Sequence, residues 1–320
     1  DQDWRVRLLA VRDLVRAGDD AIDAIAAGLS DEHVQVRYLS AMALGVLKAT
    51  EAVPALERTL KEDDQAVVRS QAAIALGQIN DEAALETLGD RRSNDPSKDV
   101  RHQCELSIDQ IKKGRGATEA LRTAYRKLDP KTFETVKVNQ PAPEFTLNDT
   151  EGRPHNPIEQ RGDGWVVLIW VFADWCPVCH GEFRELIELR EQFKQQEVKV
   201  HTIEAHDMYR ARVMVGKELD PEYWFAEQSF QKTYTQKIWW PHLVDHAGAV
   251  GATYGVDPLA YAVHAEYINR PATIIIDPQG RVRFAYYGTY WGDRPSIEKT
   301  LEMIRDEEFS FVHPDRLASP

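Results

Sequence analysis

Cysteine is scarce in this 320-residue chain, which has only Cys104, Cys176 and Cys179. So few cysteines exclude a small fold held together by several disulfides. Long apolar runs are also missing, and no stretch approaches the length that a helix needs to cross a bilayer. The chain therefore has to fold around ordinary hydrophobic cores, and we expect a soluble protein without a membrane partner.

Basic residues are outnumbered as well, with 39 Lys and Arg against 52 Asp and Glu and a formal net charge of −13. Phosphate backbones are bound by basic surfaces, so this balance argues against nucleic acid as the main partner. The content of 43% hydrophobic and 28% charged residues is that of a globular protein, and the length suits two domains. Because the chain opens on Asp1 rather than Met, we expect that a preceding segment was removed. The compartment therefore stays open, since export and a cytoplasmic location both fit.

The first third of the chain repeats itself. The dipeptide Val-Arg recurs every 30–32 residues, at 6–7, 36–37, 68–69 and 100–101. A small residue follows each Arg after three positions, and a large aliphatic residue follows after seven. The small residues are Ala10, Ser40, Ala72 and Cys104, and the aliphatic ones are Leu14, Leu44, Leu76 and Ile108. Spacings of three and seven fall on one helical face, so each repeat predicts a packed helix.

With a second helix in each unit, such as 52–60 with Pro54 in its first turn, residues 1–113 resemble short HEAT-like repeats. The resemblance implies an all-α solenoid that binds a protein partner, and it implies no chemistry. Cys104 occupies the small buried position of its repeat, so we interpret it as structural. The Lys-Lys-Gly-Arg-Gly stretch ends the pattern, and we assign 114–137 as a connector.

The richest motif is Trp175-Cys176-Pro177-Val178-Cys179. An apolar run at 165–172, rich in β-branched and aromatic residues, precedes it and suits a buried strand. A helical pattern over 182–193 follows it. Two thiols three positions apart at a helix N-terminus can cycle between dithiol and disulfide, because the helix lowers a thiol's pKa. Strand, Cys-x-x-Cys and helix in this order predict a redox site rather than a merely structural pair.

Residues 138–308 resemble the redoxin branch of the thioredoxin-like superfamily, an α/β fold, leaving 309–320 as a tail. Two motifs carry the resemblance: the Cys pair, and Arg270-Pro271 directly before the strand at 272–277. The resemblance implies a cis-proline loop that faces the thiols and binds substrate through Arg270 and Pro271. It also implies that Cys176 is the exposed attacking thiol, that Cys179 resolves the mixed disulfide, and that Trp175 shields one side.

Two rival chemistries use the same cysteines. Cys176 to His180 also matches Cys-x-x-Cys-His, the attachment signal of c-type haem, but the apolar strand leading into the motif leaves little room for haem. A peroxiredoxin-type peroxidase expects Pro-x-x-x-Thr/Ser-x-x-Cys, and neither cysteine fits that register. We therefore expect no cofactor, and we expect His180 on the helix surface.

A third resemblance involves 202–206, Thr-Ile-Glu-Ala-His, and the tail at 286–301. Both are similar to segments of iodothyronine deiodinases, in which a carboxylate and an imidazole assist proton transfer. This resemblance favours a deiodinase-like bacterial redoxin, with sulfur in place of selenium. It makes Glu204 and His206 candidates for proton transfer, although a strand-end Glu and a surface His explain them equally well.

The segment 207–268 is a long insertion with aromatic clusters at 223–225 and 239–240. The aromatics indicate a core or the entry to the thiols. His242 and His246 have the i, i+4 spacing of metal ligands if a helix starts at Pro241, but no third ligand is in view. We therefore expect no metal.

These observations together predict a thiol–disulfide oxidoreductase behind a solenoid scaffold. A deiodinase-like reductive enzyme that acts on an aromatic or small-molecule substrate is the alternative enzyme. A redox-sensing scaffold without turnover is the alternative outside catalysis.

Overall fold

The structure is a computed structural model that describes residues 3–218 and 235–314. The described chain forms two compact units. The helical unit contains 3–130 together with Pro258–Ile268. The sheet unit contains Lys131–Glu218, 235–257 and the part that begins at Asn269. Each unit is described by itself.

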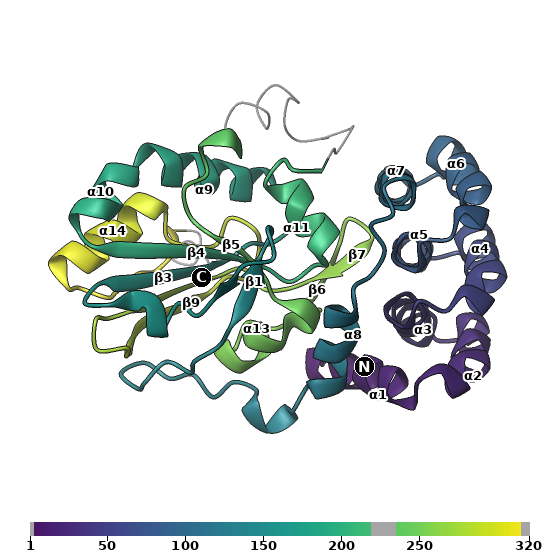
Figure 1. Cartoon of the computed structure of the whole chain (residues 1–320), viewed down its shortest axis with the longest axis horizontal. Helices are drawn as coiled ribbons and strands as arrows, with labels where there is room; N and C mark the ends of the chain where they lie inside the picture. Colours follow the sequence, from purple (N-terminus) through teal and green to yellow (C-terminus); the bar gives the residue numbers. More distant parts are fainter. Residues whose placement is uncertain (1–2, 219–234, 315–320) are drawn as a thin grey trace. The chain divides into compact units, whose positions relative to one another are not determined.

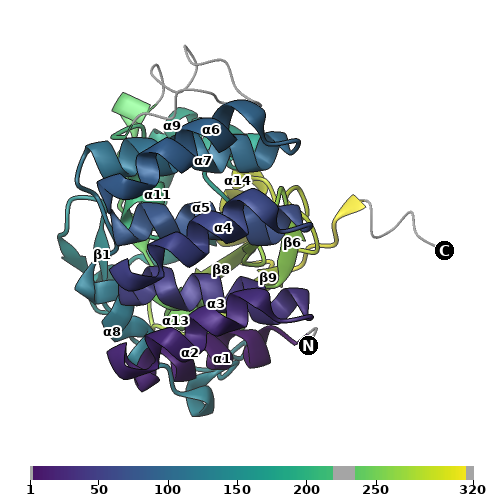
Figure 2. The same ribbon diagram turned by 90° about the vertical axis from the view of Figure 1, so that its right-hand side faces the viewer.

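The helical unit consists of paired helices, as the repeat predicts. The long first helices are α1 (Trp4–Ala17), α3 (Val34–Leu47), α5 (Ala66–Ile79) and α7 (Lys98–Lys112). The second helices are α2 (Ile22–Ala27), α4 (Val53–Glu62) and α6 (Leu85–Asn94). Figure 2 shows α3, α5 and α7 side by side, and these neighbours pack directly on one another. Pro54 lies in the first turn of α4, where its missing N–H costs nothing.

Two of the repeated arginines, Arg37 and Arg69, fasten one repeat to the next. Arg69 donates two hydrogen bonds to the Asp95 carboxylate, at 3.0 and 3.1 Å, and one to the Asp63 carbonyl at 2.8 Å. Arg37 makes the same contacts one repeat earlier, with the Asp63 carboxylate and the Asp31 carbonyl. The Val-Arg period in the sequence is therefore the period of a buried Arg–Asp ladder.

The first repeat departs from the predicted register. Ser40, Ala72 and Cys104 are buried as expected, but Ala10 and Leu14 are only half-buried. Their helix instead buries Leu8, Val11 and Val15. The reason is that α1 ends the stack and packs against α8 (Glu119–Lys127) as well as α3. The connector therefore holds a helix of the same unit, while the domain boundaries at 113 and 137 stay predictions.

A β-hairpin from the long insertion also belongs to the helical unit. It consists of β6 (Tyr261–Val263) and β7 (Glu266–Ile268), joined by two residues with positive φ, His264 and Ala265. The Tyr267 ring packs edge to face on Tyr38 with ring centroids 4.8 Å apart, and the Arg7 guanidinium lies 5.0 Å from the same ring. The hairpin thus occupies part of the face formed by the long first helices.

Further polar contacts hold this hairpin across three helices. Arg7 of α1 donates to the Leu259 carbonyl at 3.1 Å. His264 lies 3.4 Å from a carboxylate oxygen of Asp99, and Gln103 donates to Glu266 at 3.4 Å, both partners being on α7. The Tyr267 N–H donates to the hydroxyl of Tyr38, on α3, at 3.4 Å.

The sheet unit is built on a mixed sheet (Figure 1). Within the described residues the sheet has seven strands in the order β2-β1-β5-β4-β3-β8-β9. The strands are β1 (Leu147–Asp149), β2 (Pro154–His155), β3 (Trp165–Trp170), β4 (Val198–Glu204), β5 (His242–Val244), β8 (Ala272–Ile276) and β9 (Val282–Tyr287). Strand β3, called the central strand below, lies in the interior of the sheet, parallel to β4 and antiparallel to β8. This is the α/β architecture that the sequence predicts.

Among the described residues, five α-helices complete the unit: α9 (Pro177–Glu188), α10 (Arg190–Gln195), α11 (Met208–Met214), α13 (Ala249–Tyr254) and α14 (Ile297–Asp306). The helical pattern over 182–193 is broken at Leu189, whose φ of −91° and ψ of 8° lie outside the helical region. Helix α9 packs against α14. Among the described residues, no helix has the length and apolar character that crossing a membrane requires.

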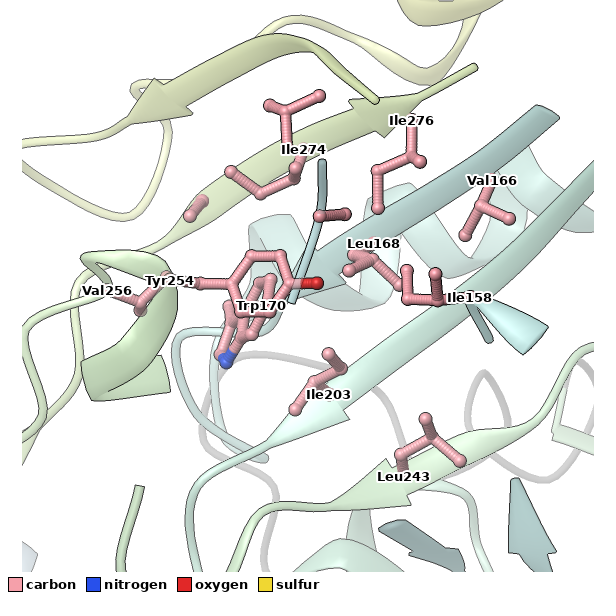
Figure 3. Packing of buried hydrophobic residues seen from close by; sticks show 13 residues of the cluster. Ile158, Val166, Leu168, Trp170, Ile203, Leu243, Tyr254, Val256, Ile274 and Ile276 are labelled. Carbon is pink, nitrogen blue, oxygen red and sulfur yellow. The ribbon is translucent and has the colours of Figure 1, made fainter. Parts of the chain in front are cut away.

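One hydrophobic cluster of the sheet unit lies on one face of β3 (Figure 3). Val166, Leu168 and Trp170 alternate along the strand and meet apolar residues of the neighbouring strands. The Trp170 ring packs on Tyr254 of α13, with centroids 5.5 Å apart. The residues between these three positions of β3, Val167 and Ile169, are buried on the opposite face of the strand. A strand that is buried on both faces needs apolar residues at every position, which explains the continuous apolar run in the sequence.

The Arg–Asp ladder yields a stability prediction. Replacing Asp95→Asn leaves the buried Arg69 guanidinium without its anion, and breaking a buried pair costs about 3 kcal/mol or more. We expect faster amide hydrogen exchange throughout α5 and α7. The matched control is Asp306→Asn, which breaks an exposed pair with Arg305 and should change exchange little. Equal exchange in both variants would show that the ladder does not hold the repeats together.

Candidate active site

The Cys pair lies where the central strand turns into α9. Cys176 is the N-cap of this helix, and its sulfur accepts the Cys179 N–H at 3.4 Å. Pro177 stands at the first helical position, where a missing N–H is tolerated. Both cysteines are free thiols. The strand–turn–helix context predicted from the sequence is therefore present.

Burial of both thiols corrects one expectation. Cys176 and Cys179 each have 0% relative exposure, so the outer thiol is not exposed in this structure. Trp175 is 3% exposed and packs edge to face on Phe172, with ring centroids 5.9 Å apart. These two aromatic side chains flank the turn that carries Cys176, which explains why sequence position at a helix N-terminus did not imply exposure. Any molecule that is to reach the Cys176 sulfur therefore has to displace part of the residues that cover it.

Arg294, from the loop between β9 and α14, reaches the inner thiol. Its guanidinium donates to the Cys179 sulfur at 3.3 Å and to the Trp170 carbonyl at 2.8 Å. The same guanidinium lies 2.6 Å from a carboxylate oxygen of Glu182. Arg294 is buried, and so is Glu182, which lies on α9 one turn beyond Cys179. A buried cation thus touches a thiol and a carboxylate.

These contacts shift the pKa values of the two thiols in opposite directions. Burial raises the pKa of Cys179, but the hydrogen bond to Cys176, the charge of Arg294 and the Phe172 N–H lower it, and the net direction is well below the ordinary thiol value. Burial, together with the neighbouring Cys179, raises the pKa of Cys176. The inner sulfur is therefore the one that carries negative charge most readily.

The loop before β8 lies at the same end of the sheet. Antiparallel pairing sets Trp170 opposite Ala272, so Pro271 stands beside the residue that follows β3. The Asn269 side chain donates to the carbonyls of Val171 and Arg270, at 3.0 and 2.9 Å, which pins the loop to the central strand. Arg270 pairs with Asp257 at 2.9 Å.

The predicted cis bond at this loop is not found. The described residues contain no cis peptide bond, so Arg270–Pro271 is trans. A trans bond is the lower-energy form for any X-Pro pair, and the side-chain clamp of Asn269 fixes the loop without a cis reversal.

The loop over 288–296 connects this region with Arg294. Its Gly288 N–H donates to the Pro271 carbonyl at 2.8 Å. A Cβ at position 288 would lie 2.4 Å from the Asp293 carbonyl and 2.9 Å from the Pro271 ring, so only glycine allows this approach. The Asp293 carboxylate accepts from the Tyr286 hydroxyl and from Thr289, which folds the loop tightly just before Arg294.

Glu204 and His206 lie together at the end of β4. Glu204 is fully buried, and His206 Nδ1 is hydrogen bonded to its carboxylate. His242 approaches the other carboxylate oxygen at 3.8 Å. Burial raises the pKa of Glu204 despite the opposing effect of His206. The pair exists as a unit, which neither a lone strand-end Glu nor a lone surface His would give.

A buried ion pair connects this unit with the redox motif. Asp174, two residues before Cys176, accepts from Arg210 Nε at 3.0 Å. The charges of Asp174 and Arg210 both influence Glu204. His180 Nε2 donates to the Asp174 carbonyl at 2.6 Å, and burial lowers its pKa. The expectation that His180 lies on the helix surface is wrong, because its ring turns inward to bond this carbonyl.

The structure also tests whether His242 and His246 of the insertion lie on one helix. His242 lies in strand β5 and His246 in a short 3₁₀ turn, so no helix begins at Pro241 and the i, i+4 argument fails. The described residues contain no group of three or more His, Cys, Asp or Glu side chains arranged for a metal ion. Trp239 and Trp240 pack on Phe193 and Phe183, while 223–225 lies outside the described residues.

Cys104 is fully buried in α7, and burial raises its pKa to about 12. A thiol in this state is a poor nucleophile, which agrees with a structural role.

Sequence reasoning missed three groups at this site, namely Arg294, Glu182 and the Asp174–Arg210 pair. Arg294 lies within the 286–301 segment that was similar to deiodinases, and Glu182 within the helical pattern after the motif. A signal was present for Glu182, because helical spacing puts it on the same face as Cys179 and Leu186. For Arg294 the sequence gave no sign of its partner, which is 115 positions away.

Comparisons with known proteins agree with both halves of the chain. Residues 138–285 match the AhpC/TSA family, and residues 1–73 and 22–109 match HEAT repeats. The chain joins HEAT repeats to a thioredoxin-like redoxin domain. These matches confirm the prediction of a solenoid followed by a thioredoxin-like oxidoreductase.

The redoxin part is similar to named relatives. Thiol-disulfide oxidoreductase ResA of Geobacillus thermodenitrificans is 29% identical over 170 residues, which are 53% of this chain and 79% of the relative. Thiol:disulfide interchange protein DsbE of Pasteurella multocida is 27% identical over 192 residues, 58% of this chain and 88% of the relative. Among solved structures, peroxidoxin BcpB of Mycobacterium tuberculosis is 20% identical, with 53% of this chain and 97% of that chain covered and a TM-score of 0.41.

Burial of the thiols leads to a labelling prediction. With native protein and a small alkylating reagent, Cys176 and Cys179 should react at least about tenfold more slowly than in denaturant, because the site must open first. Mass spectrometry of the labelled peptides measures each rate, and Cys104 serves as an internal buried reference. Rapid native labelling of Cys176 would show that the cover opens without substrate.

Proposed function

We propose that this redoxin domain is a thiol–disulfide oxidoreductase that works through Cys176 and Cys179. The observation that carries the proposal is the pair of free thiols at the start of α9, one of them held by a buried guanidinium and a backbone N–H. The names of the ResA and DsbE relatives support the same reaction class.

In the reducing direction, Cys176 passes its proton to the neighbouring Cys179 thiolate and attacks a substrate disulfide. The substrate thiolate that is released takes this proton back from Cys179. The Cys179 thiolate then attacks the Cys176 sulfur of the mixed disulfide and releases the second. The reverse reaction uses Cys179 as the leaving group, and a leaving thiol of low pKa departs faster. The contacts of Arg294 with Cys179 support this assignment in both directions.

Substrate binding is assigned to Trp175, Arg270 and Pro271. Pro271 stands beside the end of β3, where an extended substrate segment would meet the motif. Trp175 directly precedes the buried Cys176 and is itself buried, so its side chain would move to admit substrate. Arg270 is held by Asp257, so its aliphatic stem and backbone are the parts offered to substrate.

Cysteine variants test the reaction directly. Cys176→Ser should abolish reduction of insulin disulfides, because the attacking sulfur is gone. Cys179→Ser should accumulate a mixed disulfide on Cys176, because nothing resolves it. The control Cys104→Ala should keep parental activity, since this thiol is buried in the helical unit. Insulin reduction by the Cys176→Ser variant at the parental rate would contradict the proposal.

A second candidate is reductive dehalogenation of an aromatic substrate, favoured by the buried Glu204–His206 pair. The balanced reaction is that a carbon–halogen bond and two thiols become a carbon–hydrogen bond, a disulfide and a hydrogen halide. The carbon centre needs a proton, and a protonated Glu204, reached from solvent through the half-buried His206, would supply it.

The pH dependence of halide release tests this candidate. Because burial raises the pKa of Glu204, its proton is present at higher pH than in an exposed Glu and is lost as the pH rises through that value. We therefore expect the rate of halide release to fall as the pH is raised. Glu204→Gln should lower kcat by about 100-fold and should abolish this fall at high pH. Release of iodide from an iodinated phenol, with a dithiol as reductant, is the measurement.

The control is Glu302→Gln, on an exposed position of α14. Absence of iodide release from the parent protein, with insulin reduction intact, would remove dehalogenation and leave disulfide exchange.

The HEAT repeats are assigned a scaffold role for a protein partner. The hairpin β6–β7 already covers part of the face formed by α1, α3 and α7. We therefore assign the partner to the opposite helices α2, α4 and α6. A redox-sensing scaffold without turnover would share this surface and would keep partner binding while lacking insulin reduction.

A further inference from the structure

Arg294 faces two groups that can each carry a negative charge. Its guanidinium donates to the Cys179 sulfur at 3.3 Å and approaches a Glu182 carboxylate oxygen at 2.6 Å. The Arg294 side chain is 1% exposed and that of Glu182 is 10% exposed. The cation is also fixed in place, because it donates to the Trp170 carbonyl in the central strand.

Charge balance in this buried cluster limits its ionisation. A buried charge without a partner costs several kcal/mol, so Arg294 requires one anion. Two anions against one cation would leave a second buried charge uncompensated. The cluster is therefore stable with a single negative charge, on either Cys179 or Glu182.

The redox state decides which group is available. A disulfide carries no charge, so in the oxidised protein only Glu182 can balance Arg294. We propose that Arg294 is a shared counter-ion, which pairs with the Glu182 carboxylate when the disulfide is closed and with the Cys179 thiolate when the pair is reduced. This inference rests on the proposed use of Cys176 and Cys179 as the redox pair.

The reaction balances with Glu182 as a proton acceptor. Two electrons from a dithiol donor break the Cys176–Cys179 bond, and the donor's two thiols become a disulfide and release two protons. One proton goes to Cys176, which becomes a thiol, and the other goes to the Glu182 carboxylate. Cys179 stays as the thiolate, so the cluster has the same net charge before and after.

The surroundings of Glu182 agree with a protonated carboxyl in this dithiol structure. Burial raises its pKa to about 8, with Arg294 opposing and Cys179 and Glu185 adding to the rise. Glu185 is itself engaged with the Ile297 N–H. His180 also faces Cys179 from the same helix, and burial lowers its pKa, so it stays neutral near pH 7.

A consequence for the redox equilibrium follows. A cation that stabilises the thiolate stabilises the reduced protein and makes the pair a stronger oxidant. The carboxylate opposes this effect, because it gives the same cation a partner in the oxidised protein. Removing Arg294 and removing Glu182 should therefore shift the equilibrium in opposite directions.

Proton counting on the full chain tests the proposal. The first step is to show that wild-type protein closes and reopens the Cys176–Cys179 disulfide. Reduction near neutral pH in weak buffer with a pH indicator should then consume two protons in the wild type, after correction for the donor. Glu182→Gln should consume one, because Cys179 stays ionised and position 182 takes none.

Redox equilibria give an independent test. Against a glutathione buffer, Arg294→Met should favour the disulfide by at least about tenfold, which equals about 30 mV toward a more reducing pair. Glu182→Gln should favour the dithiol, and Arg294→Lys should fall between wild type and Arg294→Met. If the role of Arg294 were merely structural, Arg294→Met and Glu182→Gln would not shift the dithiol–disulfide equilibrium in opposite directions.

Infrared difference spectra of the wild type remove any dependence on variant folding. Reduction should produce the band of a protonated carboxyl group, and Glu182→Gln should lack this band. Two protons consumed by Glu182→Gln, or no carboxyl band in the wild type, would overturn the shared counter-ion while disulfide exchange stands. Failure of the wild type to form the Cys176–Cys179 disulfide would instead overturn the proposed function, and this inference with it.

Discussion

Three consecutive backbone groups at the end of β3 organise the candidate site. The Trp170 carbonyl accepts from Arg294, the Val171 carbonyl accepts from Asn269, and the Phe172 N–H donates to the Cys179 sulfur. Because β3 is the central strand and is buried on both faces, these groups are held as rigidly as the core itself. The Arg294 guanidinium, the loop at Arg270 and Pro271, and the inner thiol are therefore all bonded to the same short backbone segment. Buried backbone groups need hydrogen-bond partners, and here the partners are residues of the candidate site.

Features encoded within a short stretch of sequence could be predicted, and those that depend on distant residues could not. The strand, the Cys pair and the helix are adjacent in the chain, and the Val-Arg period returns in the structure as the Arg69–Asp95 contact. Arg294 lies 115 positions from Cys179, and no local pattern marks that contact. Exposure of Cys176 was predicted wrongly because a helix N-terminus says nothing about what covers it. The cis bond before Pro271 was wrong because it came from resemblance alone, whereas Asn269 fixes this loop in the chain at hand.

Buried charges occur in a different arrangement in the helical repeats and in the candidate redox site. The repeats are stabilised by a regular ladder whose buried ion pairs recur with the sequence period. The candidate redox site instead concentrates buried charge that ordinary packing would avoid, with Arg294, Glu182, Asp174 and Arg210 all near one motif. Such clusters of buried ionisable groups are more typical of sites that move protons or electrons than of structural cores.

The hairpin at 258–268 has a consequence for the order in which the protein is made. Arg7 and the Leu259 carbonyl are 252 positions apart, and Tyr38 and Tyr267 are 229 apart. During synthesis the repeats emerge long before the hairpin that packs on them, so their long first helices stay incompletely covered until most of the chain has left the ribosome. Contacts between residues so far apart in the sequence form slowly. Their entropic cost is only a little higher than that of closer contacts, because the cost of closing a loop grows with the logarithm of its length. The last contacts of the helical unit to form thus belong to a segment that ends one residue before Asn269, whose side chain bonds the carbonyls of Val171 and Arg270 at the candidate site.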